Sequence, residues 1–517
     1  MSKTSKLIAA IDMGSNSYHL TIAEETGEAN LKIIDEHKEE VRVAELVDSN
    51  GYLTQEAFEQ SAKSLLRMKE ISSSWNAAVR AVGTHSIRMA KNHTEFCNYL
   101  KSKTGINVEI IDGLEEARLS LMGIRLGLPI EKTQVLGIDI GGGSTEAVIA
   151  CGESISYARS LSIGAVNLNT RFFKEKKPKR KEIESMKLWL NSRFVPLEQE
   201  ARSFNFTKAI GASGSIRAIA RCIYYMTSGT NLDNLHGQSF STHDLNDFLK
   251  ILTKLKDPKK IMQSFPLERK RAEIILSGTC ILAAVSDLFA VEEWQASSWG
   301  LRQGLILDTI SRLVSATSAR SPYHEVRLKT INDLSKKFGV SAKYNQQVST
   351  FSQNIFEQLE KRCPKTSRIS KTESLEVLFA AANLSEIGKT INYRNFHKHS
   401  AYLITHSDLM GYSMYEKELI AAVTLYSRKK LMKADTSDLP CKLVNFLTGC
   451  LRIAKAANRS RKNEIMSVNC FYNSAKIIFE FVMKSDEVPA AEQYSLEKEH
   501  KYLCKAFETD IEYRYTS

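Results

Sequence analysis

Residues 138–146 carry side chains suited to binding an anion. An apolar run, Val135 to Ile138, leads into Asp139, and Gly141 to Ser144 separate this aspartate from Glu146. The order predicts a strand, a tight turn and a second strand. Glycines let backbone N–H groups approach an anion closely, and successive N–H groups in a turn form an anion-binding concavity. Asp139 at the strand end could hold a metal ion or water, although an ordinary glycine-rich hairpin would have the same sequence.

The same arrangement occurs 127 residues earlier. Asp12 follows the apolar run Leu7 to Ala10, and the small polar residues 14–17 precede another strand-like stretch. Such a repeat fixes architecture, so we expect two similar lobes, each with a phosphate-sized loop facing a shared cleft. A third loop of small residues, Gly211 to Ser215, leads directly into a helical pattern. Free N–H groups and the helix dipole favour an anion at that helix N-terminus.

The composition bounds the class of protein. At 517 residues the chain is too long for one core, so two to four domains are expected. Nine cysteines without a CxxC pair argue against a disulfide framework or a zinc site and fit a cytoplasmic protein. The apolar stretch before Asp12 is too short for a signal peptide, and no apolar run approaches the ~18 residues of a membrane span. The net charge of +12 predicts a polyanionic partner: nucleic acid, an anionic membrane surface or a phosphate polymer.

Strand and helix patterns alternate in the first 310 residues, as in α/β lobes. We expect one lobe at 1–131 and a second at 132–310. In the first lobe, strands are predicted at 31–34, 41–46, 77–82 and 108–111, and helices are predicted after the caps Thr54 and Thr94 and after Asp112. In the second lobe, a long helix to about 204, a strand at 207–210 and helices at 216–225, at 267–289 and after 299 are predicted.

The pattern changes at about residue 311. Glycine becomes sparse and helical periodicity dominates, so residues 311–443 are expected to form an α-helical domain. Residues 444–517 combine a helix at 443–457, strands at 467–471 and 476–482 and a terminal helix, which predicts a small α+β domain.

Six motifs taken together resemble one family, the exopolyphosphatase / guanosine pentaphosphate phosphohydrolase (Ppx/GppA) family. They stand in the family's order at residues 11–17, 83–88, 115–119, 138–146, 211–215 and 300–304. The resemblance implies two actin-like lobes of the sugar-kinase, Hsp70 and actin superfamily, with a ribonuclease H-like fold. The C-terminal half resembles the long members through residues 384–388 and 397–402, which implies an HD-like helical domain and a homodimer.

The resemblance also implies roles for individual residues. Glu116 matches the catalytic general base, with Glu115 expected to serve only as a first-turn dipole partner, and Glu146 matches a second cleft carboxylate that places water or metal. Asp139, Asp12 and Glu146 match positions that organise Mg²⁺, with Mn²⁺ as an alternative and K⁺ as a further ion. The phosphate-binding positions are Ser15, Asn16, Arg88, Gly141, Gly142, Gly143, Ser144, Ser213, Gly214 and Ser215. Residues 300–304 are expected to be structural.

Three functions remain open. Exopolyphosphatase activity, the release of terminal orthophosphate from inorganic polyphosphate, is favoured by the triple glycine at 141–143 and by Gly83-Thr84-His85, which look more like that branch. Guanosine pentaphosphate hydrolysis is the alternative, and a non-catalytic polyphosphate- or RNA-binding protein is the alternative of another class. A kinase would need a substrate hydroxyl and an adenosine pocket, whereas the Glu116 match favours water as nucleophile.

Two features of the C-terminal half bear on function. Basic residues between 428 and 462 form a stripe that could hold a long polyanion through multivalent contacts, or could simply be a solvated helix face. In the HD-like domain, Ser385-Glu386 stand where a metal-binding His-Asp pair is expected. The ligand set is therefore incomplete, His397 and His399 are expected to be structural residues or anion contacts, and no second hydrolase site is predicted.

Overall fold

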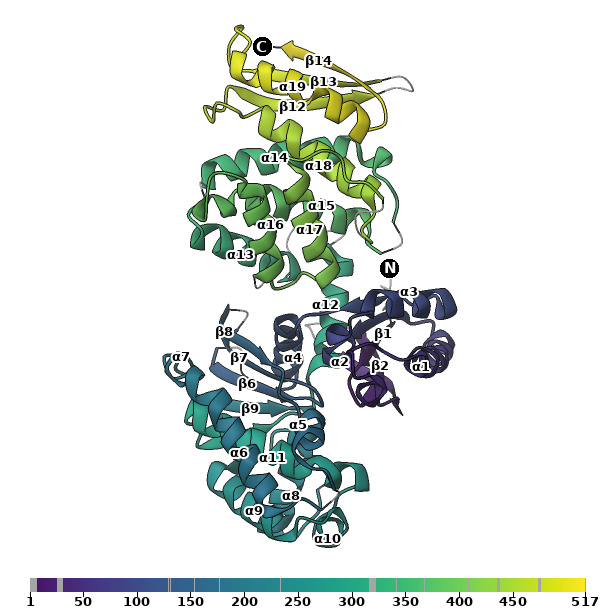
Figure 1. Cartoon of the computed structure of the whole chain (residues 1–517), viewed down its shortest axis with the longest axis vertical. Coiled ribbons are helices and arrows are strands. Elements are labelled where there is room, and N and C mark those ends of the chain that lie inside the picture. Colours follow the sequence, from purple (N-terminus) through teal and green to yellow (C-terminus); the bar gives the residue numbers. More distant parts are fainter. Residues whose placement is uncertain are drawn as a thin grey trace. The chain divides into compact units, whose positions relative to one another are not determined.

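The computed structural model describes residues 7–25, 31–128, 130, 132–152, 154–175, 177–232, 234–315, 322–340, 342–366, 368–407, 409–434, 438–472 and 476–516. The chain divides into two compact units, Met1–Thr317 and Ser318–Ser517. Figure 1 labels their elements. Glu131, the last residue of the predicted first lobe, lies outside the described residues.

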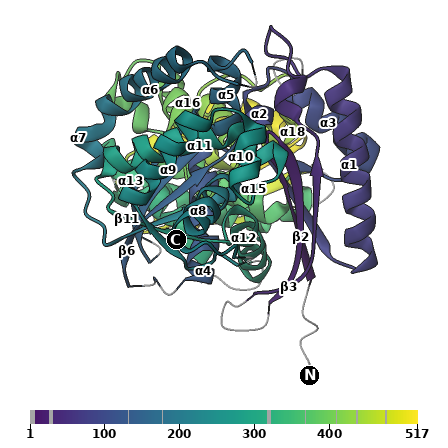
Figure 2. The ribbon, with the colours of Figure 1, turned by 90° about the horizontal axis from the view of Figure 1, so that it is seen from below.

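The first lobe is a five-stranded sheet in the order β3-β2-β1-β4-β5. Strands β1 to β3 form an antiparallel meander, and β4 and β5 run parallel to β1. Helices α1 and α3 pack on one face, where Leu65 and Phe96 meet Ile11 and Leu20 of the sheet (Figure 2). The elements are β1 (Leu7–Met13), β2 (Ser17–Glu25), β3 (Leu31–Glu40), η1 (Val43–Leu46), α1 (Gln55–Ser74), β4 (Ala78–Gly83), α2 (His85–Met89), α3 (His93–Thr104) and β5 (Val108–Ile110).

The second lobe is a six-stranded sheet in the order β10-β11-β9-β6-β7-β8. Helices α5, α6, α8, α9 and α11 cover one face and share its core (Figure 1). The elements are β6 (Gln134–Ile140), β7 (Thr145–Cys151), β8 (Ser154–Leu161), α5 (Ala165–Phe172), α6 (Arg180–Phe194), η2 (Val195–Leu197), α7 (Glu198–Ala201), β9 (Lys208–Ala212), α8 (Ser213–Ser228), β10 (Ser239–Ser241), α9 (Thr242–Leu255), α10 (Pro258–Ser264), α11 (Arg269–Phe289) and β11 (Glu293–Ala296).

Two helices exchange between the lobes. Helix α4 (Gly113–Gly127) follows the first sheet but packs on the second, and α12 (Leu301–Ser315) follows the second sheet but packs on the first. The two helices cross so closely that a Cβ at Gly123 would overlap the Gly300 carbonyl, and one at Gly304 would overlap the Leu119 carbonyl. Only glycine fits at 123 and 304, so the crossing supports a structural role for Gly304, and Gly300 takes part through its carbonyl, which lies against Gly123.

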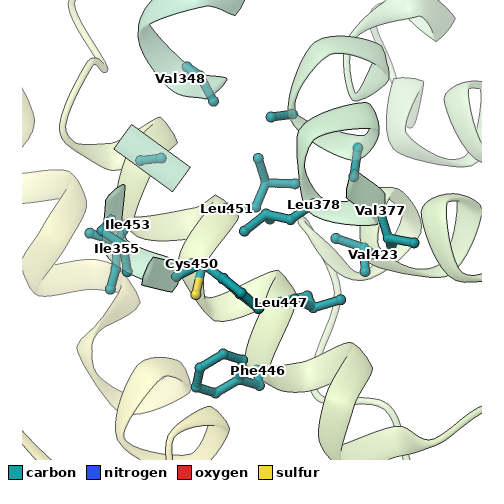
Figure 3. Close-up of a cluster of buried hydrophobic side chains, with 14 of the residues drawn as sticks. Val348, Ile355, Val377, Leu378, Val423, Phe446, Leu447, Cys450, Leu451 and Ile453 are labelled. Atoms are coloured by element: carbon teal, nitrogen blue, oxygen red, sulfur yellow. The ribbon is translucent and has the colours of Figure 1, made fainter. Parts of the chain in front are cut away.

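The second unit has one core shared by helices and sheet. Side chains of α14, α15, α17 and α18 pack around Leu447 and Leu451 (Figure 3). Strands β12, β13 and β14 form the sheet, in which β14 runs parallel to β13. The elements are α13 (Pro322–Lys337), α14 (Ala342–Gln358), η3 (Glu360–Arg362), α15 (Lys371–Leu384), η4 (Ile387–Thr390), α16 (Phe396–His406), α17 (Met414–Tyr426), α18 (Cys441–Ala456), β12 (Ile465–Tyr472), β13 (Lys476–Met483), α19 (Ala490–Ala506) and β14 (Asp510–Thr516).

The architecture confirms the predicted α/β fold class, and several local predictions need correction. Thr54 caps α1 as expected, its side chain accepting a hydrogen bond from Ala57 N. The cap of α3 is Asn92, so Thr94 lies inside the helix. Residues 43–46 form a 3-10 turn instead of a strand, the predicted helix to 204 breaks at Phe194, and strand β14 follows the helix predicted to be terminal.

Helix α11 has the length and apolar composition of a membrane span, although no uninterrupted apolar run in the sequence predicts one. In its most apolar window, 83% of the residues are buried inside the protein. The helix packs in the core of the second lobe, against residues of β6, α6 and α8. Core helices of globular proteins share this composition, so α11 is weak evidence for a membrane span.

Candidate active site

The loops of the two repeated hairpins face one cavity of about 170 Å³. In each lobe an aspartate stands at the end of the first strand: Asp12 pairs with His19 across β1 and β2, and Asp139 pairs with Glu146 across β6 and β7. Twelve of the predicted site residues line the cavity. They are Asp12, Ser15, Asn16, Glu116, Asp139, Gly141, Gly142, Gly143, Ser144, Ser213, Gly214 and Ser215. Predictions made from sequence segments up to 200 residues apart therefore converge on one place.

The loop after Asp139 is shaped for close approach. Gly141 N donates to Ser144 O at 2.9 Å and closes the turn. In the described part of the chain, the N–H groups of Gly142 and Gly143 have no protein acceptor. A Cβ at Gly143 would overlap the His85 ring and lie 3.0 Å from Ser15 Oγ, so the first lobe closes directly on this loop. The two free N–H groups are available to a bound anion.

The third loop begins helix α8. Ser213 has a φ of 91°, which is rare for a residue with a side chain, and it lines the cavity. A Cβ at Gly214 would overlap the guanidinium group of Arg271, so that arginine lies directly over the start of the helix. A helix N-terminus with a guanidinium beside it favours an anion.

Glu116 stands in the first turn of α4 because Asp112 caps that helix. The Asp112 carboxylate accepts hydrogen bonds from Leu114 N at 3.1 Å and Glu115 N at 2.8 Å. Arg88 Nη1 donates to Glu116 Oε2 at 3.2 Å and to Ile111 O at 2.7 Å. Arg88 is not among the residues that line the cavity, and it pairs with Glu116, which does line it.

Neighbouring Glu115 turns away from the cavity. Its carboxylate accepts from Arg118 Nη2 at 2.7 Å and Nε at 2.8 Å, and the pair is buried. Glu115 is therefore more than the dipole partner expected from the sequence, because it belongs to an ion-pair network between α4 and α12. Two adjacent glutamates have separate environments.

Three further carboxylates surround Glu116. Glu146 does not line the cavity; its Oε1 accepts from Ser160 Oγ at 2.8 Å. Asp139 Oδ2 accepts from Ser120 Oγ at 2.9 Å. Asp12 Oδ1 is buried without a hydrogen-bond partner, which is costly for an acceptor unless a ligand satisfies it.

Burial raises the pKa of every one of these carboxyls, and repulsion by neighbouring carboxyls adds to the rise at Asp12, Glu116 and Glu146. Burial raises the pKa of Glu116 to about 7, with Asp12 and Asp139 adding to the rise and Arg88 opposing it. Burial also raises the pKa of Asp12 to about 7 against the effect of Arg302, and it raises the pKa of Asp139. Burial and then Glu116 raise the pKa of Glu146 well above its usual range. Such shifts mark sites built for proton transfer or for a cation.

Three arginines line the cavity: Arg217 on α8, Arg271 on α11 and Arg302 on α12. The sequence analysis did not name the first two, and it expected Arg302, in the motif 300–304, to be structural, whereas Gly300 to Gln303 line the cavity. Arg302 donates to Glu36 at 2.9 Å and to Thr21 at 3.0 Å. Burial and the guanidinium groups of Arg302 and Arg271 lower the pKa of Arg217. Arg217 stands one helical turn after Ser213 of the predicted anion-binding loop, and this spacing could have placed it on the same side of the helix. No local pattern marks Arg271.

Comparison with known proteins identifies the family. The model of the Ppx/GppA phosphatase family matches residues 21–313, and the model of Ppx/GppA phosphatase domain III matches residues 326–501. A Ppx/GppA family member from Aquifex aeolicus is 27% identical with a TM-score of 0.53, over 60% of this chain and 99% of that one. An exopolyphosphatase from Cytophaga hutchinsonii is 25% identical with a TM-score of 0.54, over 59% of this chain and 98% of that one.

The first family model covers the cavity-lining residues from Gly141 to Ser144 and from Ser213 to Arg302. It begins at residue 21, after Asp12 and the loop of the first hairpin. Hydrolysis of phosphate compounds agrees with a cavity that joins carboxylates, free N–H groups and arginines. This chain belongs to the Ppx/GppA phosphatase family.

Proposed function

We propose that this protein is an exopolyphosphatase, which hydrolyses the terminal phosphoanhydride of linear inorganic polyphosphate. The observation that carries the proposal is the pair Arg217 and Arg271. Both are half-buried, both line the cavity that holds Glu116, and within the described ranges neither has a carboxylate at ion-pair distance. Burial lowers the pKa of both guanidinium groups, against the attraction of Glu36 on Arg217 and of Glu268 on Arg271, so a substrate with several phosphates would supply further counter-charge.

The reaction needs a base and a grip on the terminal phosphate. Glu116 takes a proton from water, the water oxygen forms a bond to the terminal phosphorus, and the bond from that phosphorus to the bridging oxygen breaks. The products are orthophosphate and a chain shortened by one phosphate. The raised pKa of Glu116, about 7, makes it a strong enough base near neutral pH while a useful fraction stays ionised.

A second buried carboxyl, Glu146, neighbours Glu116. Burial and then the neighbouring Glu116 raise the pKa of Glu146 well above its usual range. Glu116, which lines the cavity, accepts the proton from water, and Glu146, which does not line it, supports Glu116 from beside it. The N–H groups of Gly142 and Gly143 and the N-terminus of α8 hold non-bridging oxygens in the transition state.

The residues present fit a divalent cation that the substrate helps to bind. Among the described residues, no three His, Cys, Asp or Glu side chains gather into a complete metal site. Mg²⁺ commonly binds through one or two carboxylates together with substrate phosphates and water. Asp12, with its unpartnered buried Oδ1, and Asp139 across the cleft would supply those carboxylates. The ion, Mg²⁺ or Mn²⁺, would neutralise charge on the phosphates, and K⁺ could accompany them.

A second candidate function is hydrolysis of guanosine pentaphosphate to the tetraphosphate. Trp299 lines the same cavity, beside the ring of His236, and an indole is a platform on which a purine could stack. The two functions share the phosphate chemistry, and their substrates differ only in the group attached beyond the second or third phosphate.

Phosphate release from long polyphosphate and from guanosine pentaphosphate, measured side by side with Mg²⁺ and no acceptor, tests the proposal. We expect the higher kcat/KM on polyphosphate and loss of release in a chelator. Arg271→Ala should lower kcat/KM about tenfold through lost phosphate contacts, whereas Arg269→Ala, an exposed arginine two residues away, should leave it unchanged. Faster release from guanosine pentaphosphate would favour the second candidate, and binding without release would favour a non-catalytic binder.

A further inference from the structure

The second unit contains a cavity of about 980 Å³ that the phosphatase chemistry does not use. Its lining comes from the turn after α17, the end of α18 and the outer face of α19, with residues from α14, η4 and α16 (Figure 1). A volume of this size accommodates a cofactor-sized ligand.

The cavity is strongly cationic. Nine lysine and arginine side chains line it against two glutamates, Glu386 and Glu499. Both glutamates are already paired: Glu386 with Lys389 at 2.5 Å and Arg461 at 2.7 Å, and Glu499 with Arg452 at 2.6 Å. The acidic groups of the cavity are therefore occupied by part of the basic set.

Five basic side chains are left over. In the described part of the chain, no carboxylate lies at ion-pair distance from Arg428, Lys429, Lys430, Arg459 or Lys498. All five are exposed, so they are available to a ligand. The predicted basic stripe thus separates in the structure: its residues 428–430 and 459 line this cavity, while Lys442 pairs with Glu508 at 2.9 Å elsewhere.

A buried arginine fixes this arrangement. Arg452, 8% exposed, donates to Tyr426 O at 2.8 Å and to Lys429 O, and its other nitrogen pairs with Glu499 of α19. It therefore ties the turn that carries residues 428–430 to the helix that carries Lys498. Held side chains lose less conformational entropy when they bind a ligand.

Aromatic rings complete the lining. Tyr344 and Tyr502 lie under the guanidinium groups of Arg461 and Arg452, at 4.0 and 3.6 Å from ring centroid to Cζ. Tyr393 and Tyr494 instead expose 68% and 66% of their surfaces at the cavity. Exposed rings beside cations suit a base joined to phosphates, because each base has a face that stacks on an aromatic ring.

The cavity also includes a residue at a position where the family resemblance expects a metal ligand. Glu386 stands in the position of a metal-binding aspartate but pairs with lysines and an arginine instead. These cations outweigh the effect of burial and lower the pKa of Glu386. Lys455 Nζ donates to Ser385 Oγ at 3.2 Å. The side chains around Glu386 are thus basic, which suits the binding of phosphates.

From the five cations that have no carboxylate partner among the described residues and the two exposed rings, we infer that this cavity binds a nucleoside polyphosphate, with the base on Tyr393 and Tyr494 and the phosphates on the cationic turn. The rings favour this ligand over a chain of inorganic phosphate, which would need cations alone. The inference does not depend on the reaction at Glu116.

Photolabelling of the full chain tests the inference. The probe is 2-azidoadenosine 5′-tetraphosphate in a chelating buffer, with labelled peptides identified by mass spectrometry. We expect label on the peptides of Tyr393 or Tyr494, in addition to any label at the cleft. Half-saturation should rise about tenfold in Tyr494→Ala and in the pair Arg428→Ala and Lys429→Ala. The pair Lys433→Ala and Lys462→Ala, exposed basic residues outside the lining, is the matched control and should bind as the unaltered protein does.

Three results would overturn the inference. These are label confined to the first unit, an equal loss of binding in both pairs, and competition by inorganic tripolyphosphate that equals that of adenosine tetraphosphate and is unaffected by Tyr494→Ala. Phosphate release from tripolyphosphate, measured on the same variants with Mg²⁺, keeps this test separate from the proposed function, because the cleft is intact in all of them.

Discussion

Glu146 beside the cleft and Asp308 on α12 are both buried carboxylates, with 2% and 0% of their surfaces exposed. Their pKa values nevertheless move in opposite directions. Burial and the neighbouring carboxyls raise the pKa of Glu146 well above its usual range. Arg118, Arg312 and Arg80 outweigh burial at Asp308 and hold its pKa well below its usual range.

The difference lies in the partners. Asp308 accepts from Arg80 at 2.7 Å, from Arg118 at 2.6 Å and from Arg312 at 2.9 Å. Glu146 accepts from a serine hydroxyl, and its nearest charged neighbours are Glu116 and Asp139. A buried charge with its own counter-charges can hold elements together, whereas a buried charge without them is retained at a cost. The comparison separates the lobe junction, a structural site, from the cleft, where a substrate and a cation are expected to supply the missing charge.

The largest expected effect comes from removing the base. Glu116→Gln should lower kcat for phosphate release by about 10³-fold, since general-base catalysis contributes this order of magnitude. The thermal midpoint should not fall, because the change removes a repelled carboxyl and keeps a group that can accept from Arg88. Steady-state kinetics and a thermal melt of the same preparation measure both.

Glu115→Gln is the matched control for that change. Glu115 is the preceding residue and is also buried, but it pairs with Arg118 in the junction. We expect the opposite result, a lower thermal midpoint with little loss of kcat in protein that remains folded. A Glu116→Gln variant that keeps kcat within threefold would exclude Glu116 as the general base.

A substitution in the lobe junction should lower the stability of the protein more than its activity. Asp308→Asn leaves three arginines around a neutral amide, and breaking a buried ion pair on one side costs about 3 kcal/mol. Urea unfolding measures this loss. Glu184→Gln, which breaks the exposed pair with Arg180, should give no measurable change. Equal effects of the two substitutions would remove the distinction between the junction and the surface.

Local sequence signals predicted the parts of this comparison that depend on neighbouring residues. The hairpins around Asp12 and Asp139 and the start of α4 at Asp112 are set by short-range turn and cap chemistry. The resemblance to the family then assigned Glu116. A tertiary contact explains one error: Asn92 stands at the N-cap position of α3, two residues before Thr94, but its side chain bonds the backbone of Leu53 instead of capping the helix.

The arginines could not be predicted in this way. Arg271 reaches the cavity from α11 and Arg302 from α12, and their positions depend on how these helices pack on two sheets. The same holds for Asp308 and Arg80, which are 228 residues apart and meet only because α12 returns to the first lobe. Periodicity shows that a helix has an apolar face, but it does not show which distant charges lie at its edges.

The smallest expected effect is a pH dependence that distinguishes the two regions in the metal-free protein. The pKa of Glu116 is raised to about 7, so the folded protein binds more protons than the unfolded chain between about pH 4.5 and 7. The stability from this group is fully present below the lower value and is lost as the pH rises through about 7. From pH 5 to pH 8 the free energy of unfolding should fall by about 2 kcal/mol on this account.

Glu116→Gln should make this dependence shallower by that amount, as measured by urea unfolding in a chelator at each pH, while Asp12, whose pKa is also raised to about 7, keeps part of the slope. Asp308→Asn should keep the unaltered slope, although its curve lies lower throughout, because the lowered pKa of Asp308 places its titration below pH 3.8, outside this window. The stability that a carboxyl with a lowered pKa contributes is lost only as the pH falls through that lowered pKa. If both variants flatten the curve between pH 5 and 8, the two buried carboxylate clusters are coupled, and the division into a compensated junction and an uncompensated cleft is wrong.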